Sequence, residues 1–365
     1  MHDWFVQPGG AENCIKEMLK IYPAADLYAL IDFFDENDRR HYLNSKKVIT
    51  STLQRIPGMR KHYRKMLAFF PRAIEEFNLN RYDLVISSSH SVAKGVLTHS
   101  EQVHICYCYT PIRYAWDFYF PYLEDAGLTT GLKGWYARRV LHRLRQWDRL
   151  ASQGVDEFIG ISHFIKRRIQ KNYRREAAVI YPPVDTDFYR PLRGKREECY
   201  FTSSRMVAYK RFDIIIQAFN KMPHRKLVVG GDGPEFSKLK AIARENIEFR
   251  GYLPPGDLKL MLQKCQAFIF ASKEDFGIIP VEAQACATPV LAYSGGASLE
   301  TVKENETGLF FHEQSPEAII KCVEAFEAHH GFKETILRQW AEKFSEENFR
   351  RNFESFVKKT MSRAK

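Results

Sequence analysis

The sequence predicts an α/β protein built from two doubly wound domains. The chain has 365 residues, which is enough for two domains of ordinary size. Short β-branched or aromatic runs alternate with longer helical patterns, as in βαβ units with parallel sheets. A proline-rich stretch at 181–185, followed by a charged, glycine-containing stretch at 191–196, separates two such patterns of similar length.

The predicted strands lack clean alternation of apolar and polar residues, which is expected where helices cover both faces of a sheet. In the first half the strands are 84–86, 104–109, 158–161 and 179–181, and in the second half they are 200–202, 227–229, 267–271 and 289–293. Helical patterns lie between the later strands, at 212–221, 235–244, 255–264 and 280–286.

These elements predict an N-terminal domain at 1–190, a C-terminal domain at 191–345 and a final helix at 346–365. Ser345 suits the N-cap of that helix. Its apolar residues recur on one side, so the helix must dock against an apolar surface. They are Phe349, Phe353, Phe356, Val357 and Met361.

Composition excludes several classes of protein. A hydrophobic share of 45% rules out a wholly disordered chain. No apolar run approaches the length of a membrane-spanning helix, and the first residues show no signal-peptide pattern, so we expect a soluble protein of the intracellular type. The seven cysteines form no metal-binding pattern, so we expect reduced, mostly buried thiols and no bound metal.

The formal net charge of +11 is concentrated in two stretches. Residues 133–175 hold 12 Lys/Arg against three acids, and 55–72 hold six basic residues and no acid. In the second stretch Met59, Tyr63 and Phe70 recur at helical spacing, which predicts a basic helix with one apolar face. A solvated surface and a surface facing anionic lipid both explain this charge. Nucleic-acid binding is disfavoured because no matching motif accompanies it.

The stretch from Ala271 to Ala283 is the most informative about a possible ligand-binding site. A strand ends near Ser272, and Pro280 suits the first residue of a helix. Backbone N–H groups around Gly277, Ile278 and Ile279 would then point out of the helix N-terminus and form a site for phosphate.

Two carboxylates flank this anion site, Glu274 in the turn and Glu282 one helical turn further on. They would repel a phosphate unless they contact something else, and sugar hydroxyls are the natural candidates. The alternative is that both are helix-start acids favoured by the helix dipole.

Arg205 and Lys210 follow the first strand of the second domain, so they are expected at the carboxyl edge of its sheet, where ligands bind in such folds. Two cations there suit a diphosphate, although ordinary surface charge is the alternative. The glycine-rich turn at 230–235 is a weak signal by itself, because it matches no complete phosphate-binding motif.

In the first domain, Gly9 and Gly10 open the first helical pattern. They indicate either a second ligand-facing helix start, across a cleft from the second domain, or a flexible turn. His90 follows strand 84–86 and could face the same ligand, and Trp116 with Asp117 could line an acceptor pocket.

Together these residues resemble glycosyltransferase family 4, enzymes of the GT-B fold that use nucleotide sugars. Four motifs occur in the family's order and spacing: Gly9 to Glu12, Arg205 with Lys210, Gly230 to Glu235, and Glu274 to Glu282. The stretches 2–4 and 109–117 further resemble the bacterial O-antigen mannosyltransferase branch.

The resemblance implies two Rossmann-like domains facing a central cleft, with the final helix crossing back to the N-terminal domain. Arg205 and Lys210 would neutralise the donor diphosphate, Glu282 would hold the ribose, and Glu274 would hold a hydroxyl of the donor sugar. Backbone N–H groups of Phe276 to Ile279 would complete these contacts, and Gly9 and Gly10 would border the donor phosphates or the acceptor. The reaction would retain the anomeric configuration and need no metal or other cofactor.

Two features depart from the pattern of the family. Relatives usually have His where this chain has Tyr109, so activity or donor preference is affected unless Tyr109 can donate a comparable hydrogen bond. Relatives also have a short apolar strand ahead of residues 2–4, where this chain has Met1. Either the start is internal to a longer gene, or the first domain lacks its first strand.

The resulting expectation is a cytoplasmic retaining glycosyltransferase, bound peripherally to the inner face of an anionic membrane. It would move mannose from GDP-mannose onto a lipid-linked saccharide of a bacterial surface polysaccharide. One alternative is a UDP- or dTDP-sugar donor. Another is a catalytically impaired protein that only binds a sugar nucleotide, which Tyr109 and the absent strand favour.

Overall fold

The structure is a computed structural model that describes residues 1–329 and 331–364, and it divides into two compact units. Unit 1 contains Met1–Pro182 and the chain from Phe349 onward, and unit 2 is Pro183–Asn348. The division lies ahead of the expected 190/191 boundary because the chain after Pro183 packs onto the end of unit 2. There the Val184 N–H donates to the Phe344 carbonyl (2.9 Å), and the Thr186 hydroxyl donates to Glu342 (3.0 Å).

Unit 1 holds a parallel sheet whose strands β3 to β6 lie in chain order, with β1 and β2 paired separately. The strands are β1 Leu27–Ala29, β2 Val48–Thr50, β3 Leu84–Ser89, β4 Val103–Cys108, β5 Glu157–Gly160 and β6 Ala177–Val179. The last strand therefore lies ahead of the expected 179–181. The α-helices are α1 Gly10–Ile21, α2 Glu36–Leu43, α3 Met59–His62, α4 Phe70–Glu75, α5 Tyr119–Asp125, α6 Gly131–Ala151, α7 His163–Tyr173 and α15 Glu346–Ala364. Short 3-10 helices are η1 Thr52–Arg55, η2 Tyr63–Phe69, η3 Ala93–Gly95 and η4 Ser152–Gly154.

The N-terminal residues occupy the gap between β1 and β3. His2 forms bridges to both Ala29 and Ser88, and the Leu30 N–H donates to the Asp3 carbonyl (3.1 Å). The order across unit 1 is therefore β2, β1, residues 1–5, β3, β4, β5, β6. The position of the first strand, which the sequence analysis left in doubt, is filled at its carboxyl end by this short segment.

A cavity of about 490 Å³ lies at the amino end of the same segment. Its lining is mainly apolar and includes Met1, Leu27 and Leu84. The N-terminal amino group donates to the Ile86 carbonyl (2.8 Å), and burial lowers its pKa to about 5. The amino group of Met1 is therefore buried beside this cavity.

The expected single basic helix at 55–72 is wrong: this stretch is divided among η1, α3, η2 and α4. Gly58, in a left-handed conformation, precedes α3, and Pro71 stands at the start of α4. Its expected apolar face is nevertheless buried, since Met59, Tyr63 and Phe70 lie in the core of unit 1.

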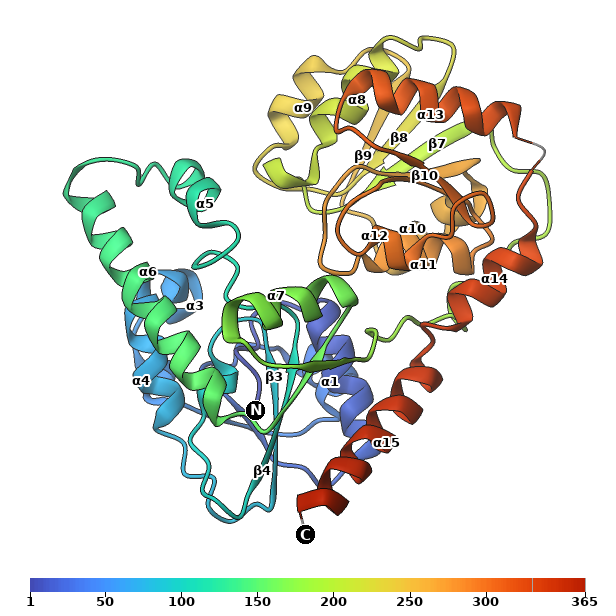
Figure 1. The fold of residues 1–365 in the computed structure, drawn as a ribbon. Coiled ribbons are helices and arrows are strands. Elements are labelled where there is room, and N and C mark those ends of the chain that lie inside the picture. The colour runs from blue at the N-terminus through green and yellow to red at the C-terminus, as the bar shows by residue number, and fades with distance from the viewer. Residues whose placement is uncertain (330, 365) are drawn as a thin grey trace. The chain divides into compact units, whose positions relative to one another are not determined.

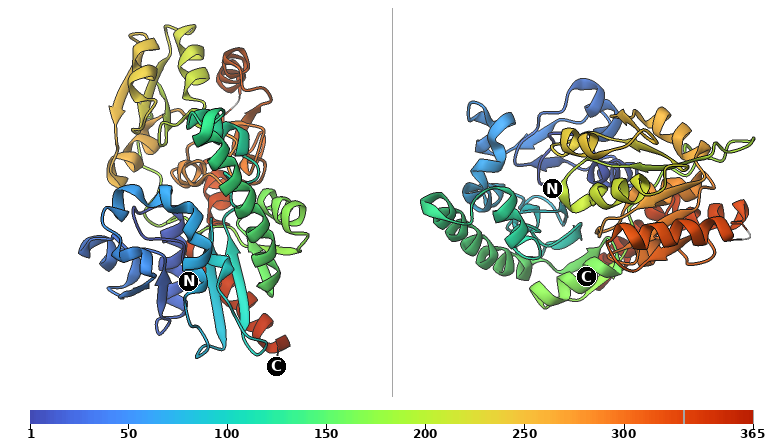
Figure 2. Two further views of the ribbon diagram at one scale, coloured as in Figure 1. Left: turned by 90° about the vertical axis from the view of Figure 1, so that its left-hand side faces the viewer. Right: turned by 90° about the horizontal axis from the view of Figure 1, so that it is seen from above.

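The final helix α15 packs on unit 1, as the resemblance implied (Figures 1 and 2). Phe349 and Phe353 are buried, with ring centroids 5.7 and 6.0 Å from that of Tyr107 in β4. Arg350 forms an ion pair with Glu17 of α1, and the Ser345 hydroxyl accepts from the Asn348 N–H (3.3 Å) as the expected N-cap.

Unit 2 is a single six-stranded parallel sheet in the order β12, β11, β10, β7, β8, β9. The strands are β7 Cys199–Ser203, β8 Lys226–Gly230, β9 Ile247–Gly251, β10 Ala267–Phe270, β11 Val290–Tyr293 and β12 Gly308–Phe311. The helices are η5 Ala208–Lys210, α8 Phe212–Asn220, α9 Phe236–Ile242, α10 Pro255–Lys264, α11 Ile278–Ala285, α12 Ser298–Thr301, α13 Pro316–Ala328 and α14 Glu334–Glu342.

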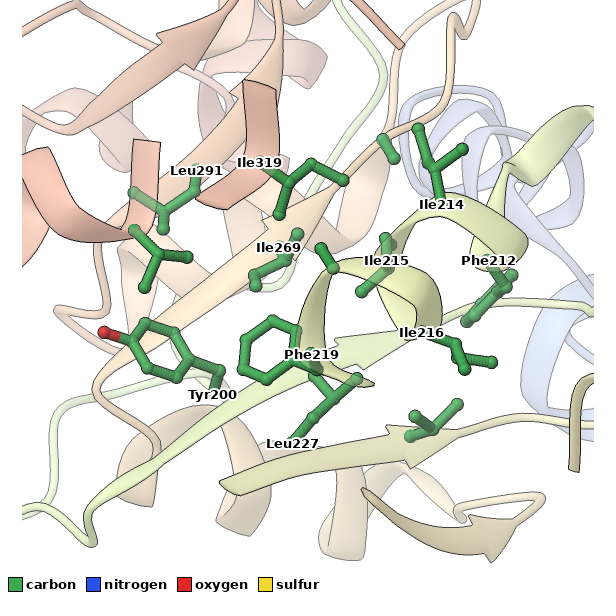
Figure 3. Packing of buried hydrophobic residues seen from close by; sticks show 14 of the residues in the cluster. Tyr200, Phe212, Ile214, Ile215, Ile216, Phe219, Leu227, Ile269, Leu291 and Ile319 are labelled. Atoms are coloured by element: carbon green, nitrogen blue, oxygen red, sulfur yellow. The ribbon is translucent and has the colours of Figure 1, made fainter. Parts of the chain in front are cut away.

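The core of unit 2 forms where α8 and α13 press onto the sheet (Figure 3). Phe219 of α8 lies against Tyr200 of β7, with ring centroids 5.4 Å apart, and Ile269 of β10 belongs to the same cluster. This packing fixes the directions of β7 and β10, whose carboxyl ends carry the predicted chemistry. All seven cysteines are buried and free, as predicted.

Candidate active site

The strand order of unit 2 creates a switch point between β7 and β10. From β7 the chain moves to its neighbour β8, and later returns to β10 on the other side of β7. The loops that follow β7 and β10 therefore diverge at the carboxyl edge, which is where ligands bind in open α/β sheets. These loops are the ones that carry Arg205, Lys210 and Glu274.

Lys210 and Glu274 meet at this edge as an ion pair. Their side chains are only 10% and 18% exposed, and the Ser272 hydroxyl donates to the same carboxylate oxygen of Glu274 (3.0 Å). The sequence analysis required Glu274 to contact something other than a phosphate, and the structure supplies Lys210. The pair therefore places a cation for phosphate and an acceptor for hydroxyls next to each other.

The glycine-rich turn after β8 shapes the loop that carries Arg205. The Met206 N–H donates to the Asp232 carbonyl (2.8 Å), so the two loops touch backbone to backbone. Gly231 has φ +112°, and a Cβ there would lie 1.9 Å from the Ser204 carbonyl oxygen. Only glycine allows this approach, and it leaves the Arg205 side chain exposed at the edge.

The helix after Glu274 begins at Ile278 and not, as expected, at Pro280. Gly277 caps it in a left-handed conformation (φ +82°), which lets the chain turn from the loop into the helix. Because Pro280 has no N–H, the first-turn amides without an acceptor inside the helix come from Ile278 and Ile279. The expected anion-binding backbone is thus present at the predicted residues, although the helix begins two residues earlier than predicted.

Glu282, inside α11, has a buried carboxyl group. Its Oε2 has no hydrogen-bond partner among the described residues. Burial raises the pKa of Glu282 to about 8, although the hydroxyl of Tyr189 counteracts part of this shift. A buried carboxyl with an unused oxygen suits a ligand that donates hydroxyl hydrogen bonds, which is the role expected for a residue that holds ribose.

Unit 1 has a corresponding switch point at residues 1–5, which β1 flanks on one side and β3 on the other. Asp3 is fully buried there, and its carboxylate accepts the N–H groups of His90, Ser91, Val92 and Ala93 at 2.6–2.9 Å. The His90 Nδ1 lies 3.0 Å from the same carboxylate. Asp3 therefore holds the whole loop after β3.

Charges around this loop shift two pKa values. Burial by itself raises the pKa of Asp3, but His90, His2 and the backbone N–H groups hold it below its ordinary value. Burial lowers the pKa of His90, with Asp3 opposing. His90 keeps 29% of its side chain exposed at the edge. The pair thus presents an imidazole whose orientation Asp3 sets.

Tyr109 does not face outward in unit 1. Its hydroxyl lies 2.8 Å from the Ser88 hydroxyl and donates to the Ala11 carbonyl (3.0 Å), in the first turn of α1. The hydroxyl therefore links β3, β4 and the start of α1. His90, and not Tyr109, shows a partly exposed ring at this edge.

Gly9 and Gly10 stand at the start of α1, as predicted. Gly9 has extended backbone, and a Cβ there would lie 3.3 Å from a carboxylate oxygen of Glu12. Glu12 in turn lies 3.4 Å from the Nε2 of His2. The turn therefore covers a buried His–Glu pair and is less crowded than the glycine-rich turn of unit 2.

The two candidates for an acceptor pocket have partners inside unit 1. The Trp116 indole donates to Asp148 (2.8 Å), which is buried with Lys94 at 2.6 Å. Asp117 pairs with Arg168 (3.3 Å). Trp116 therefore anchors its loop to the core, while Asp117 remains partly exposed.

Sequence reasoning missed four contributors, Asp3, Glu12, Ser272 and Tyr189, as site residues. Asp3 and Glu12 lie within motifs that carried the resemblance, so their place in those motifs was an available signal. Tyr189 gave no signal, because its approach to Glu282 depends on how the chain after Pro183 packs on unit 2.

Two family models together match most of the chain. The model described as "Glycosyltransferase Family 4" matches residues 8–188, and the model described as "Glycosyl transferases group 1" matches residues 185–343. The boundary between the two matches lies close to the division between the units.

Curated relatives are similar over part of the chain. A GDP-mannose-dependent alpha-(1-6)-phosphatidylinositol monomannoside mannosyltransferase of Mycobacterium tuberculosis is 26% identical over 217 residues, covering 51% of this chain and 54% of the relative. A D-inositol 3-phosphate glycosyltransferase of Mycobacterium bovis is 34% identical over 152 residues, covering 36% and 32%. An uncharacterised glycosyltransferase of Methanocaldococcus jannaschii is 27% identical over 177 residues, covering 47% and 50%. The chain spans about half the length, or less, of these relatives.

Solved structures match nearly the whole chain. Anabaena Alr3699/HepE, in complex with UDP and glucose, has a TM-score of 0.69 at 18% identity and covers 98% of both chains. A sucrose-phosphate synthase from Thermosynechococcus elongatus has a TM-score of 0.70 at 14% identity, covering 99% and 95%. At these identities the matches show the fold. With both family models and the parallel-sheet topology of the two units, they establish that the chain belongs to glycosyltransferase family 4 and has the GT-B fold.

Proposed function

We propose that this protein is a retaining glycosyltransferase that transfers mannose from GDP-mannose to a lipid-linked saccharide in the synthesis of a bacterial surface polysaccharide. The observation that carries the proposal is the Lys210–Glu274 pair at the switch point of unit 2, with the exposed Arg205 on the neighbouring loop. It combines positive charge for a diphosphate with a hydroxyl acceptor for a sugar.

In the proposed reaction, the bond between the sugar C1 and the diphosphate oxygen breaks, and the oxygen of an acceptor hydroxyl forms the new bond on the same face. The proton of that hydroxyl passes to the departing diphosphate oxygen. Arg205, Lys210 and the amides at the start of α11 stabilise the charge that develops on the departing diphosphate. Glu274 orients a hydroxyl of the donor sugar, and Glu282 holds the ribose. These chain groups supply the required positive charge, so we propose no cofactor.

In unit 1 we propose that the Gly9–Gly10 turn and His90 contact donor or acceptor. His90 suits this role because Asp3 fixes its ring while part of it stays exposed. Tyr109 keeps α1 in place. On this proposal, the replacement of the family's usual His by Tyr109 removes one ligand contact without disrupting the loops.

The choice of mannose rests on the mannosyltransferase relative, which covers only part of this chain. The solved structure of Alr3699/HepE holds UDP and glucose, which favours a UDP-sugar donor as the second candidate. We place the protein on the cytoplasmic side of the membrane as a peripheral protein. Within residues 1–329 and 331–364, no helix combines the length and apolar character needed to cross a membrane.

The test is a donor panel with a bacterial lipid extract, followed by mass spectrometry. GDP-mannose, GDP-fucose, UDP-glucose, UDP-GlcNAc and dTDP-rhamnose are each incubated with the full chain. Lys210→Ala and Glu274→Ala are expected to lower turnover by about a hundredfold or more. Lys226→Ala is the matched control, because Lys226 pairs with Glu248 (2.8 Å) at the amino end of β8, away from the candidate site.

Each outcome decides between the candidates. Release of GDP from GDP-mannose alone, lost in both variants and kept in the control, supports the proposal. Turnover of a UDP- or dTDP-sugar contradicts mannose as the transferred sugar but still supports a glycosyltransferase. A folded protein that binds a nucleotide but turns over no donor supports the impaired binding protein, and one that binds none contradicts the proposed function.

A further inference from the structure

The α5–α6 arm, which we define as residues 119–143, exposes large apolar side chains in unit 1. Leu132 is 87% exposed, Phe120 is 72% exposed, and Trp135 is 58% exposed. Tyr122 and Tyr136 are exposed on the same arm. In Figure 1, α5 and the start of α6 extend away from the sheet of unit 1. Single exposed apolar residues are ordinary, but a group this dense on one projection indicates a contact surface.

Several exposed apolar and basic side chains of α6 lie on one face of the helix, with the apolar ones nearer its start. Leu132, Trp135 and Tyr136 are spaced three and four residues apart, so they share one face of the helix. Arg139 and Arg143 continue the same face toward the body of unit 1. The side of α6 that packs on unit 1 is a different one, because the buried Leu141 and Leu144 follow Leu132 by nine and twelve residues and so lie on another face of the helix.

The arm is held in shape by its own contacts, so this exposure does not come from a frayed helix end. Arg138 donates to the Thr129 carbonyl (2.8 Å), and a Cβ on Gly134 would lie 2.5 Å from the Leu128 carbonyl oxygen. Arg145 donates to the Ala115 carbonyl (2.9 Å), and its guanidinium lies 4.7 Å from the centroid of the Tyr119 ring.

The charge of α6 is almost entirely positive. Its sequence holds six Lys/Arg and a single acid, Asp148, which is buried against Lys94. Glu124 and Asp125, at the end of α5, are the exposed acids of the arm. The short helix η2 contacts α6 and adds exposed Arg64, Lys65 and Phe69. The exposed basic residues of α6 and η2 therefore outnumber the two exposed acids of the arm.

We propose that the α5–α6 arm docks unit 1 on an anionic lipid bilayer, with Leu132 and Trp135 inserted and Arg139 and Arg143 among the headgroups. At 1.5 Å per residue, Leu132 and Arg139 are separated by about 10 Å along α6, which matches the 5–10 Å to which interfacial segments insert. Trp and Tyr favour the boundary between water and hydrocarbon. The basic residues behind them complement acidic headgroups.

This inference refines the proposed peripheral location of the enzyme and rests on that part of the proposed function. It concerns a surface of unit 1 alone, and it involves none of the residues proposed to bind the donor. Vesicle binding and donor binding can therefore fail independently, and each is measured on the same full-length protein.

The experiment measures co-sedimentation with vesicles of phosphatidylglycerol and phosphatidylcholine in equal parts, and with phosphatidylcholine alone. The double variant Leu132→Ser/Trp135→Ser is expected to weaken binding to the anionic vesicles at least about tenfold. Leu150→Ser is the matched control, because Leu150 is 73% exposed on the same helix but lies outside the arm. Arg139→Gln/Arg143→Gln is expected to weaken binding and flatten its dependence on added salt.

Circular dichroism and donor binding show whether each variant is folded. Loss of vesicle binding in the arm variants, with Leu150→Ser unchanged, supports the proposal. Equal binding by all variants, or binding that ignores lipid charge, overturns it and leaves the transferase proposal standing. Self-association without lipid that disappears in Leu132→Ser/Trp135→Ser also overturns it, because the arm then serves a second copy of the chain.

Discussion

The two units differ in the segment that lies at the switch point of the sheet. In unit 2, the first strand β7 pairs along its length with β8 and also pairs with β10. In unit 1, residues 1–5 take the corresponding position but form only isolated bridges, and a cavity of about 490 Å³ lies at their amino end. The carboxyl edges of both units nevertheless hold clusters of charged residues.

The two edges also use their charges differently. Asp3 in unit 1 is fully buried and binds the backbone of the next loop. Glu274 in unit 2 keeps part of its side chain exposed and pairs with another side chain, Lys210. We infer that the acid of unit 1 stabilises its loop, whereas the acid of unit 2 remains accessible to a ligand.

Asp3→Asn tests this difference most strongly. The substitution removes a buried charge that accepts four backbone N–H groups, so we expect unfolding free energy to fall by about 3–5 kcal/mol. Lys210→Met in unit 2 should lower stability by less than Asp3→Asn does, because Glu274 keeps 18% of its side chain exposed and retains the hydrogen bond from Ser272. Urea unfolding measures both. Equal stability losses would contradict the distinction between the two edges.

The units are expected to respond to pH in opposite directions between pH 5 and 8. The Met1 amino group has a pKa of about 5 in the folded chain against 8.0 ordinarily, so the unfolded chain binds more protons and stability rises with pH. This contributes at most about 4 kcal/mol. Glu282, with its pKa raised to about 8, binds more protons when folded, so its contribution to stability falls over the same range.

One chemical modification and one substitution separate these opposing effects, each measured by urea unfolding at several pH values. Acetylation of the N-terminus should remove the increase in unfolding free energy with pH that comes from the Met1 amino group. His104, whose pKa burial lowers to about 4, adds a smaller increase at the acidic end of the range. Glu282→Gln should remove the decrease in unfolding free energy with pH that comes from unit 2. If neither change alters the pH profile, these two groups do not produce the predicted effect.

The smallest expected effect comes from filling the cavity in unit 1. Ala25 lines the cavity, so Ala25→Leu is expected to raise unfolding free energy by about 1 kcal/mol through apolar burial. Ala208→Leu, at an exposed position of unit 2, is the control and should have no such effect. A loss of stability in Ala25→Leu would show that the cavity cannot accept further apolar volume.

Much of the architecture was predictable because strand and helix patterns are local. Strand β10, expected at 267–271, forms at Ala267–Phe270, and α8, expected at 212–221, forms at Phe212–Asn220. The short strands β1 and β2 were missed, because three residues are too few for a clear pattern. The helix expected at 55–72 was wrong, because apolar spacing was given more weight than the breaks at Gly58 and Pro71.

The sequence by itself determined the two-unit α/β organisation and the loops that carry the candidate chemistry, since helix and strand periodicity and loop motifs depend on neighbouring residues. Only the tertiary structure decided which groups meet. Lys210 and Glu274 are 64 residues apart, and His90 and Asp3 are 87 apart. Tyr109 turned inward toward Ala11 for the same reason. Such contacts follow from strand order and packing, which bring distant parts of the chain to one sheet edge, and no local pattern in the sequence records them.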